Sequence, residues 1–132
     1  MSVLSLADKS YDAQIAAIER GLPGSTLRQI VEALGLSQKA IVEALGFAPR
    51  TVALRVSRKQ AFSSVESERL FRVIRMRKLA RDVFSTDDAV AQWLTTPDRV
   101  LAGRTPLSML ATDLGTAKVE QLLLAMTHGV PV

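Results

Sequence analysis

The chain has 132 residues, a net charge of +4 and 48% hydrophobic residues, which is enough apolar material for one buried core. It has no cysteine, which excludes disulfides and thiolate metal sites and is compatible with a reducing cytoplasm. Aromatic residues make up only 5%, so aliphatic side chains must fill the core, and this favours packed helices over a β-sandwich. The sequence shows neither a secretory signal nor an apolar run near the ~18 residues of a membrane span, so we expect a cytoplasmic protein without a membrane partner.

The first quarter of the chain predicts two helices separated by a turn. The first ten residues lack clear periodicity and are expected to be loose. Tyr11, Ile15 and Ile18 recur at i, i+4 and i+7, which predicts a helix over residues 8–20 with these side chains inward. A glycine and proline turn at residues 21–24 ends it, and a short amphipathic helix is expected before Gly35.

A helix-turn-helix pattern follows at residues 37–57. Ser37 is a helix N-cap, Gly46 ends that helix, and Pro49 suits the first position of the next one. In such a motif the first helix braces the DNA backbone and the second enters the major groove. The alternative is a helix pair that only packs within a bundle.

The second helix of this motif carries side chains suited to DNA. Arg50, Thr51 and Arg55 are candidates for base contacts, since a guanidinium can donate two hydrogen bonds to guanine O6 and N7. Ala53 suits a thymine methyl group, and Gln38 suits a phosphate at the start of the bracing helix. Basic residues after the second helix suit phosphates. The candidate DNA-binding residues are Gln38, Arg50, Thr51, Ala53, Arg55, Arg58 and Lys59.

Positive charge is concentrated in the middle of the chain. Residues 47–84 hold ten Lys or Arg against three Asp or Glu, a net +7, whereas residues 1–46 have net −1 and residues 85–132 net −2. Such a block is typical of a nucleic-acid footprint, so the segment from Arg55 to Arg81 is expected to extend the DNA surface. The alternative is a solvated helix face.

The longest helix is expected from Ser64 to Phe84. Its apolar stripe comprises Leu70, Val73, Met76, Ala80 and Phe84, and Phe71, Ile74 and Leu79 lie off this stripe. This surplus of apolar surface predicts a homodimer, which would also suit a palindromic DNA site.

The last third predicts three shorter helices. They follow Ser85 to Asp88, Thr105-Pro106 and Gly115, and a loop covers residues 97–104. Trp93, on the apolar face of the first of them, is either a core residue or a partner contact. We therefore predict an all-α fold, with an N-terminal helix-turn-helix bundle continuous with a small helical C-terminal domain. The predicted divisions are residues 1–24 (N-terminal helix and hinge), 25–84 (DNA binding and dimerisation) and 85–132 (partner binding).

Catalytic motifs are missing from the sequence. It has no glycine-rich phosphate loop, no cluster of metal ligands and no nucleophile with a histidine beside it. We expect neither an enzyme nor a cofactor.

From Gly21 to Gly129 the sequence resembles the Xre/MbcA/ParS-type antitoxins. The N-terminal likeness rests on Gly35-Leu36-Ser37, Leu45-Gly46, Arg50-Thr51-Val52 and Ser64 to Leu70. The C-terminal likeness rests on Ala91 to Leu94, Leu101 to Leu110, Thr112 to Gly115, Val119 to Leu123 and His128-Gly129-Val130. Its most specific part is Gly103-Arg104-Thr105-Pro106-Leu107. The segment before Gly21 matches least, and the usual small residue after the recognition helix is replaced around Gln60-Ala61.

The resemblance implies a type II antitoxin of a RES-Xre system. Such a protein binds and blocks a RES-domain toxin that degrades NAD, and represses its own operon by binding operator DNA. The toxin-binding residues expected in the loop and the C-terminal tail are Asp98, Arg99, Arg104, His128, Gly129, Val130 and Pro131. We hypothesise that the tail plugs the NAD pocket of the toxin. The alternative is a stand-alone helix-turn-helix transcription regulator whose C-terminal module serves dimerisation or ligand sensing.

Overall fold

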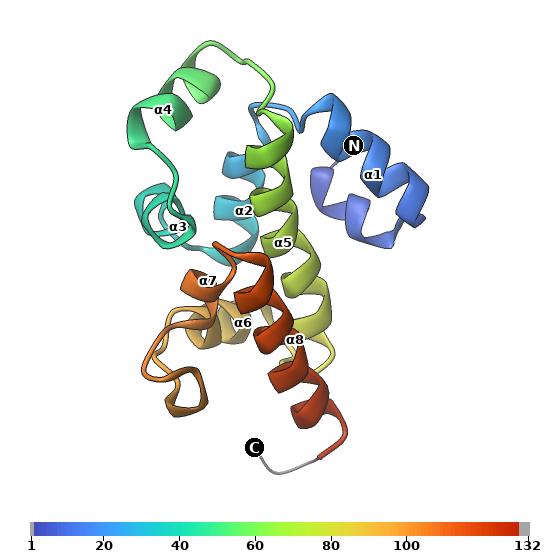
Figure 1. Ribbon diagram of the computed structural model, residues 1–132, viewed down its shortest axis with the longest axis vertical. Coiled ribbons are helices and arrows are strands. Elements are labelled where there is room, and N and C mark those ends of the chain that lie inside the picture. The colour runs from blue at the N-terminus through green and yellow to red at the C-terminus, as the bar shows by residue number, and fades with distance from the viewer. Residues whose placement is uncertain (1, 130–132) are drawn as a thin grey trace.

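The chain is helical throughout the region described by the computed structural model, residues 2–129. Within that range no strand forms, and the one β-type pairing is a bridge between Asp98 and Arg104. The predicted all-α fold is confirmed. None of these helices combines the length and apolar character needed to cross a membrane. The elements are η1 (Val3–Asp8), α1 (Tyr11–Arg20), α2 (Thr26–Leu34), α3 (Gln38–Leu45), α4 (Pro49–Ser57), α5 (Ser64–Arg81), α6 (Asp87–Leu94), η2 (Arg99–Leu101), α7 (Pro106–Met109) and α8 (Asp113–Thr127) (Figure 1).

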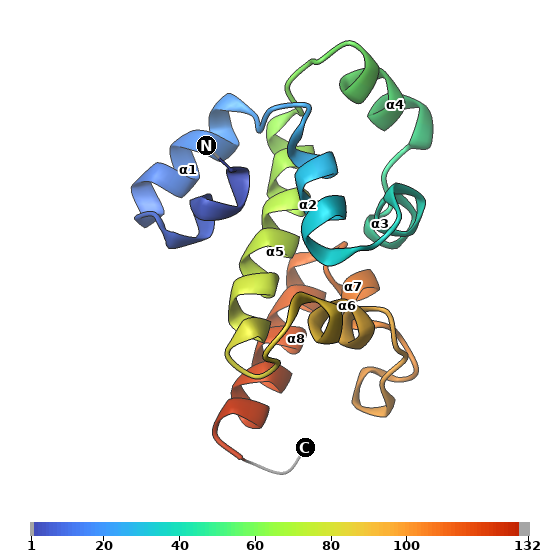
Figure 2. The same ribbon diagram turned by 180° about the vertical axis from the view of Figure 1, so that it is seen from behind.

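Helix α5 runs through the middle of the molecule. Helix α1 lies on one side of it and α2 to α4 on the other, while α6 and α8 pack against it further along (Figures 1 and 2). Helix α4 occupies the opposite end of the molecule from the last turn of α8 (Figure 1). The two ends can therefore serve two different partners.

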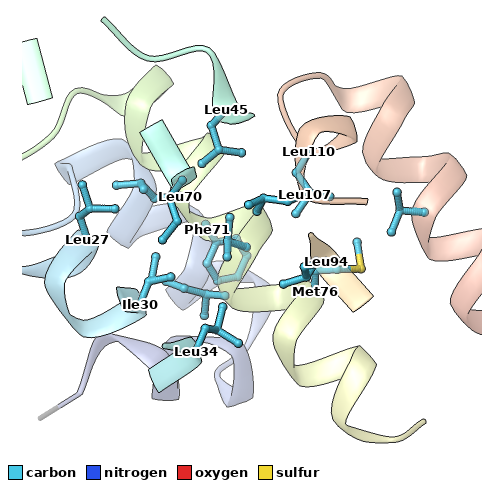
Figure 3. Packing of buried hydrophobic residues seen from close by; sticks show 14 of the residues in the cluster. Leu27, Ile30, Leu34, Leu45, Leu70, Phe71, Met76, Leu94, Leu107 and Leu110 are labelled. Atoms are coloured by element: carbon cyan, nitrogen blue, oxygen red, sulfur yellow. The ribbon is translucent and has the colours of Figure 1, made fainter. Parts of the chain in front are cut away.

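A single hydrophobic core joins the helix-turn-helix region to the C-terminal third. Helix α2 packs on α6, and α3 packs on α7. Figure 3 shows the buried side chains that meet there, among them Leu27, Ile30 and Leu34 of α2, Leu45 of α3, Leu94 of α6, and Leu107 and Leu110 at α7. Each fully buried leucine contributes about 1.5–3 kcal/mol, so this packing fixes how the two regions are oriented. The division at residue 84 thus stays a prediction about function.

Hydroxyl side chains set most of the helix starts. Ser10, Ser37, Ser63, Thr86, Thr105 and Thr112 each accept a backbone N–H from the first turn that follows. The cap at Thr112, which bonds Gly115 N–H at 3.0 Å, starts α8 at Asp113 rather than after Gly115 as expected.

The N-terminal segment is ordered, contrary to the expectation of a loose start. It forms η1, whose Val3, Leu4, Leu6 and Ala7 pack against the core. The Val3 N–H donates to the Gln29 side chain at 2.7 Å, and Lys78 donates to the Ala7 carbonyl at 3.1 Å. Sequence periodicity missed this segment because its contacts are made with α2 and α5.

The predicted apolar face of α1 does not point inward. Tyr11 is 84% exposed and Ile15 is 53% exposed, and only Ile18 of the three is half-buried. Helix α1 instead turns Gln14 toward η1, where its amide donates to the carbonyl oxygens of Leu6 and Lys9 at 3.2 and 3.1 Å. An exposed apolar patch results.

The apolar side chains of α5 that lie off its main stripe pack within a single chain. Phe71 and Ile74 are buried, and Leu79 packs against the same core. The argument for a homodimer from these three side chains is therefore wrong, because α2, α6 and α8 surround α5. A dimer, if formed, needs another surface.

Candidate nucleic-acid and protein interfaces

The predicted helix-turn-helix is present as α3 and α4. Helix α3 begins after Ser37, whose hydroxyl accepts the Ala40 N–H at 3.0 Å, and ends at Gly46, where φ is 72°. Pro49 opens α4, where its missing N–H leaves no bond unmade. The side chains buried around this motif are Ile41, Val42, Leu45, Phe47 and Val52. They hold the two helices at a fixed angle.

Most of the predicted base-reading residues lie on the open surface of α4. Arg50 and Ala53 are exposed, and Thr51 is half-buried. Leu54 is also exposed, four residues after Arg50 and thus on the same face. The prediction from sequence missed Leu54, although its spacing from Arg50 was a usable signal. It adds an apolar group able to contact a thymine methyl.

The predicted phosphate-binding residues flank this surface. Gln38 is exposed in the first turn of α3, and Arg58 and Lys59 are exposed directly after α4. Lys59 has a φ of 53°, in the left-handed region that favours glycine. The sequence departs from the family pattern at Gln60-Ala61, where a small residue is usual. The strained backbone of Lys59 lies directly before this departure.

Arg55 is tied to the start of α5. Its Nε donates to Glu66 Oε1 at 3.2 Å, and the same oxygen accepts the Ser63 N–H at 2.7 Å. Partial burial raises the pKa of Glu66, but the hydrogen bonds from Ser63 and the charge of Arg55 outweigh it and hold that pKa below its ordinary value of 4.5. Glu66 thus remains charged, and Arg55 retains only its terminal nitrogens for DNA.

The hinge before α2 lies directly against the segment that follows α4. A Cβ on Gly24 would lie 2.7 Å from the Gln60 carbonyl oxygen and 2.8 Å from that of Arg55. The Phe62 N–H donates to the Leu22 carbonyl at 2.8 Å. Glycine at position 24 therefore leaves the room that the last turn of α4 and the residues after it need to pack against the hinge.

The basic residues of α5 make contacts within the fold, so the positive charge block also has a structural role, and its part in DNA binding stays a prediction. They bind within the fold: Arg69 over the Phe47 ring, Arg72 to the carbonyls of Leu110 and Ala111, Arg75 to Glu120, Arg77 and Arg81 to Asp87, and Lys78 to Asp8. These contacts connect α5 to η1, α6, α7 and α8. Arg50, Arg58 and Lys59 remain exposed for DNA at this end.

The loop before α7 has a defined structure. The Asp98 N–H donates to the Arg104 carbonyl at 3.0 Å, and the Asp98 carboxylate accepts the Val100 N–H at 2.8 Å. Ala102 and Gly103 both have positive φ, at 58° and 81°. Asp98 therefore shapes the loop, while Arg99 and Arg104 are exposed and available to a partner.

The predicted toxin-binding residues of the C-terminal tail are distant from this loop in sequence. His128 is the exposed C-cap of α8, and Gly129 follows with a φ of 66°. Val130 and Pro131 lie outside the described residues. The loop and the end of α8 lie at the same end of the molecule, opposite α4 (Figure 1).

A groove, which we call the groove along α8, lies between α7 and the first turns of α8. It measures about 550 Å³ and is lined by Arg104, Ser108, Met109, Thr112, Leu114, Gly115 and Lys118. A second hollow of about 220 Å³ continues from Lys118 to Gln121, Leu122 and Val100. Lys118 lines both hollows and was not among the predicted residues, because a lone lysine on a helix carries no signal in the sequence.

Trp93 packs against neighbouring side chains and does not project freely into solvent. It is half-buried, and its ring centroid lies 5.6 Å from that of Phe84 in a tilted arrangement. It also packs against the hydrophobic core. These contacts favour the interpretation of Trp93 as a core residue over that of a partner contact.

Two family models match successive parts of the chain. The antitoxin Xre-like helix-turn-helix domain matches residues 13–75, and the antitoxin Xre/MbcA/ParS C-terminal toxin-binding domain matches residues 79–129. The first match contains α3 and α4, and the second contains the loop and the groove along α8.

Similar proteins include antitoxins of several bacteria. Antitoxin Xre of Photorhabdus laumondii is 34% identical over 116 residues, covering 87% of this chain and 78% of that protein. Antitoxin Xre of Pseudomonas putida is 38% identical over 80 residues, covering 61% of this chain and half of that protein. A crystal structure of the M. tuberculosis MbcT-MbcA toxin-antitoxin complex contains a chain that is 26% identical, with a TM-score of 0.63 over 83% of this chain and 96% of that one.

Proposed function

The chain belongs to the Xre/MbcA/ParS antitoxin family, and we propose that it neutralises a RES-domain toxin that degrades NAD and represses its own operon. It is an antitoxin of a toxin-antitoxin system with a helix-turn-helix domain. The observation that carries the finer proposal is the coupling of two family domains in one core, with exposed surfaces at opposite ends. A cytoplasmic location follows from the proposed partners, and catalysis by the antitoxin itself forms no part of the proposal.

The C-terminal domain is the proposed toxin-binding part. Arg99 and Arg104 project from a structured loop, and His128 and Gly129 end α8 at the same end of the molecule. Asp98 acts by holding the loop in shape through the Val100 N–H. Occupying the entrance of the toxin's NAD pocket would block catalysis without any chemistry by the antitoxin.

The recognition helix α4 is the proposed operator-binding part. Arg50 is exposed, and Thr51, Ala53 and Arg55 lie on the same nine-residue helix. Arg58, Lys59 and Gln38 would contact phosphates, which adds affinity and salt dependence without reading sequence.

We retain the homodimer as a proposal on a different surface. Tyr11 and Ile15 of α1 are exposed, and so is Val65 at the start of α5. Ile18 lies one turn from Ile15 and lines a hollow together with Val65, which brings apolar side chains of α1 and α5 next to one another, bordered by Glu68, Arg69 and Arg72. Contiguous apolar surface of this kind marks an interaction site. A second copy would place two recognition helices for a palindromic operator.

The proposal is tested by expressing the chain with the RES-domain toxin from the same operon. We expect growth and cellular NAD to recover with the full chain. A chain that lacks residues 129–132 should bind the toxin but leave NAD falling, if the tail plugs the pocket. Undiminished neutralisation by that truncation would refute the tail mechanism, and failure of the full chain to restore NAD would refute the proposed function.

The alternative hypothesis is that the chain is a stand-alone transcription regulator. It accounts for the match at residues 13–75 but gives no role to the toxin-binding match at residues 79–129. Isolation of the tagged chain from its host with no toxin bound, together with intact operator binding, would support it.

A further inference from the structure

The groove along α8 carries a charge opposite to that of the domain around it. Residues 85–132 have a net charge of −2. Several acids of this region are nevertheless occupied elsewhere: Asp87 pairs with Arg77 and Arg81, and Glu120 pairs with Arg75. The Asp98 carboxylate accepts a backbone bond within its own loop.

Two free cations line the groove itself. Arg104 and Lys118 both line it and are exposed, and within residues 2–129 neither belongs to an ion pair. Asp113 is exposed nearby but does not line the groove. The groove therefore presents unneutralised positive charge to solvent, and an acidic partner would complement it.

Two apolar side chains also line the groove. Leu114 is 83% exposed, although it is a large aliphatic side chain, and Met109 is half-buried beside it. Gly115 lets α8 approach α7 closely, since a Cβ there would lie 2.1 Å from the Met109 carbonyl oxygen. This close approach places Leu114 and Lys118 next to Arg104 in one depression.

We propose that this groove receives a segment of the toxin that carries acidic side chains next to an apolar one. The carboxylates would lie against Arg104 and Lys118, and the apolar side chain against Leu114 and Met109. This inference rests on the proposed function and adds the chemistry of the toxin surface. It also assigns Lys118 and Leu114, which the sequence did not, to the interface.

An acidic protein segment and the phosphates of DNA could each bind exposed cations. The other residues that line the groove favour the protein segment. Phosphate contacts need positive charge alone, whereas the exposed Leu114 and the half-buried Met109 in the groove suit an apolar side chain. Helix α3 lies between the recognition helix α4 and α7, which borders the groove (Figures 1 and 2).

The test compares two charge reversals of equal size. The double variant Arg104→Glu and Lys118→Glu alters the groove, and the control, Lys9→Glu and Arg20→Glu, alters exposed cations of the N-terminal segment. Affinity for the purified RES-domain toxin from the same operon is measured at two salt concentrations, with operator binding measured in parallel. Circular dichroism checks that each chain is folded.

We expect the groove variant to bind toxin at least about 10-fold more weakly, with slower association at low salt, while the control changes less than about twofold. Leu114→Ala should also weaken binding with no change in salt dependence. Unchanged toxin affinity of both groove variants would overturn the groove proposal and leave the proposed function intact. A loss of operator affinity with unchanged toxin affinity would assign the groove to DNA and overturn it as well. Failure of the unmodified chain to bind toxin would instead refute the function on which it rests.

Discussion

Glu66 Oε1 lies 3.2 Å from Arg55 Nε, so that one carboxylate joins the recognition helix to the first turn of α5. The same oxygen accepts the Ser63 N–H, which closes the capping box of α5. Position and stability of α4 therefore depend on a residue that is not predicted to touch DNA.

Glu66→Gln should weaken operator binding several-fold and lower the free energy of unfolding by about 1 kcal/mol, because the charge-assisted bond to Arg55 becomes neutral. Operator affinity and urea unfolding at pH 7 measure both effects. Glu68→Gln is the matched control, since Glu68 is half-buried on the same helix and has no ion pair within residues 2–129. Equal effects of the two substitutions would show that the Arg55 contact does not position α4.

Gly24→Ala should destabilise the fold by about 1–3 kcal/mol and weaken operator binding, since the added Cβ meets two carbonyl oxygens at 2.7 and 2.8 Å. Relief of this collision must move the segment after α4. Gly35→Ala is the comparison: Gly35 has open space around its Cβ position but a φ of 70°, so its cost is conformational only. Operator affinity that falls equally in both variants would contradict a specific role for Gly24.

Arg50→Ala and Lys59→Ala should differ in how they weaken DNA binding. Arg50, exposed on α4, is expected to read a base, so its loss should cost about 1–3 kcal/mol for the operator and little for unrelated DNA. Lys59 is expected to contact phosphate, so its loss should weaken both and reduce the salt slope by about 1. Filter binding across salt concentrations separates the two. A uniform loss for Arg50→Ala would reassign it to the backbone.

Local signals in the sequence were enough to predict the helix-turn-helix. Ser37, Gly46 and Pro49 act through their own backbone geometry, so α3 and α4 were expected within a residue of their observed bounds. The C-terminal helices were found in the same way, through hydroxyl caps such as Thr86 and Thr105.

Contacts between distant segments could not be predicted in this way. The charge of Arg77 indicated DNA but not its ion pair with Asp87, and the spacing of Tyr11 indicated burial although no element covers it among residues 2–129. Lys118 gained significance only because α8 packs next to the loop that carries Arg104. Charge and hydrophobic periodicity describe one helix at a time. The roles of Arg77, Tyr11 and Lys118 depend on how two elements pack, which the sequence of one element does not give.

Asp87→Asn should lower stability at pH 7 by about 1–2 kcal/mol, because Asp87 accepts two bonds from Arg77, at 2.8 and 3.0 Å, and pairs with Arg81. The hydrogen bonds from Arg77 are the main reason that the pKa of Asp87 lies below its ordinary value of 3.8, and they outweigh its partial burial. A lowered folded-state pKa gives stability that is present above pH 3.8 and is lost as the pH falls through the folded-state value.

The difference between Asp87→Asn and the unmodified chain should therefore vanish in acid. Urea unfolding at pH 7 and again below the folded-state pKa measures it. Asp88→Asn, the exposed neighbour in the same helical turn, should cost under about 0.5 kcal/mol at either pH. Equal costs at pH 7 for the two substitutions would assign the effect to the helix dipole rather than to the arginines.

Replacing Tyr11 and Ile15 together with serine should shift the chain from dimer to monomer, since these exposed side chains form most of the apolar patch on α1. Neither side chain is buried in one chain, so the fold should lose little stability. Sedimentation equilibrium at micromolar concentration measures the state, with Leu124→Ser as the control for an exposed apolar residue elsewhere. A monomeric unmodified chain would refute the homodimer. A double variant that stays dimeric would move the interface away from α1, because a dimer held by this patch cannot survive the loss of its two largest exposed side chains.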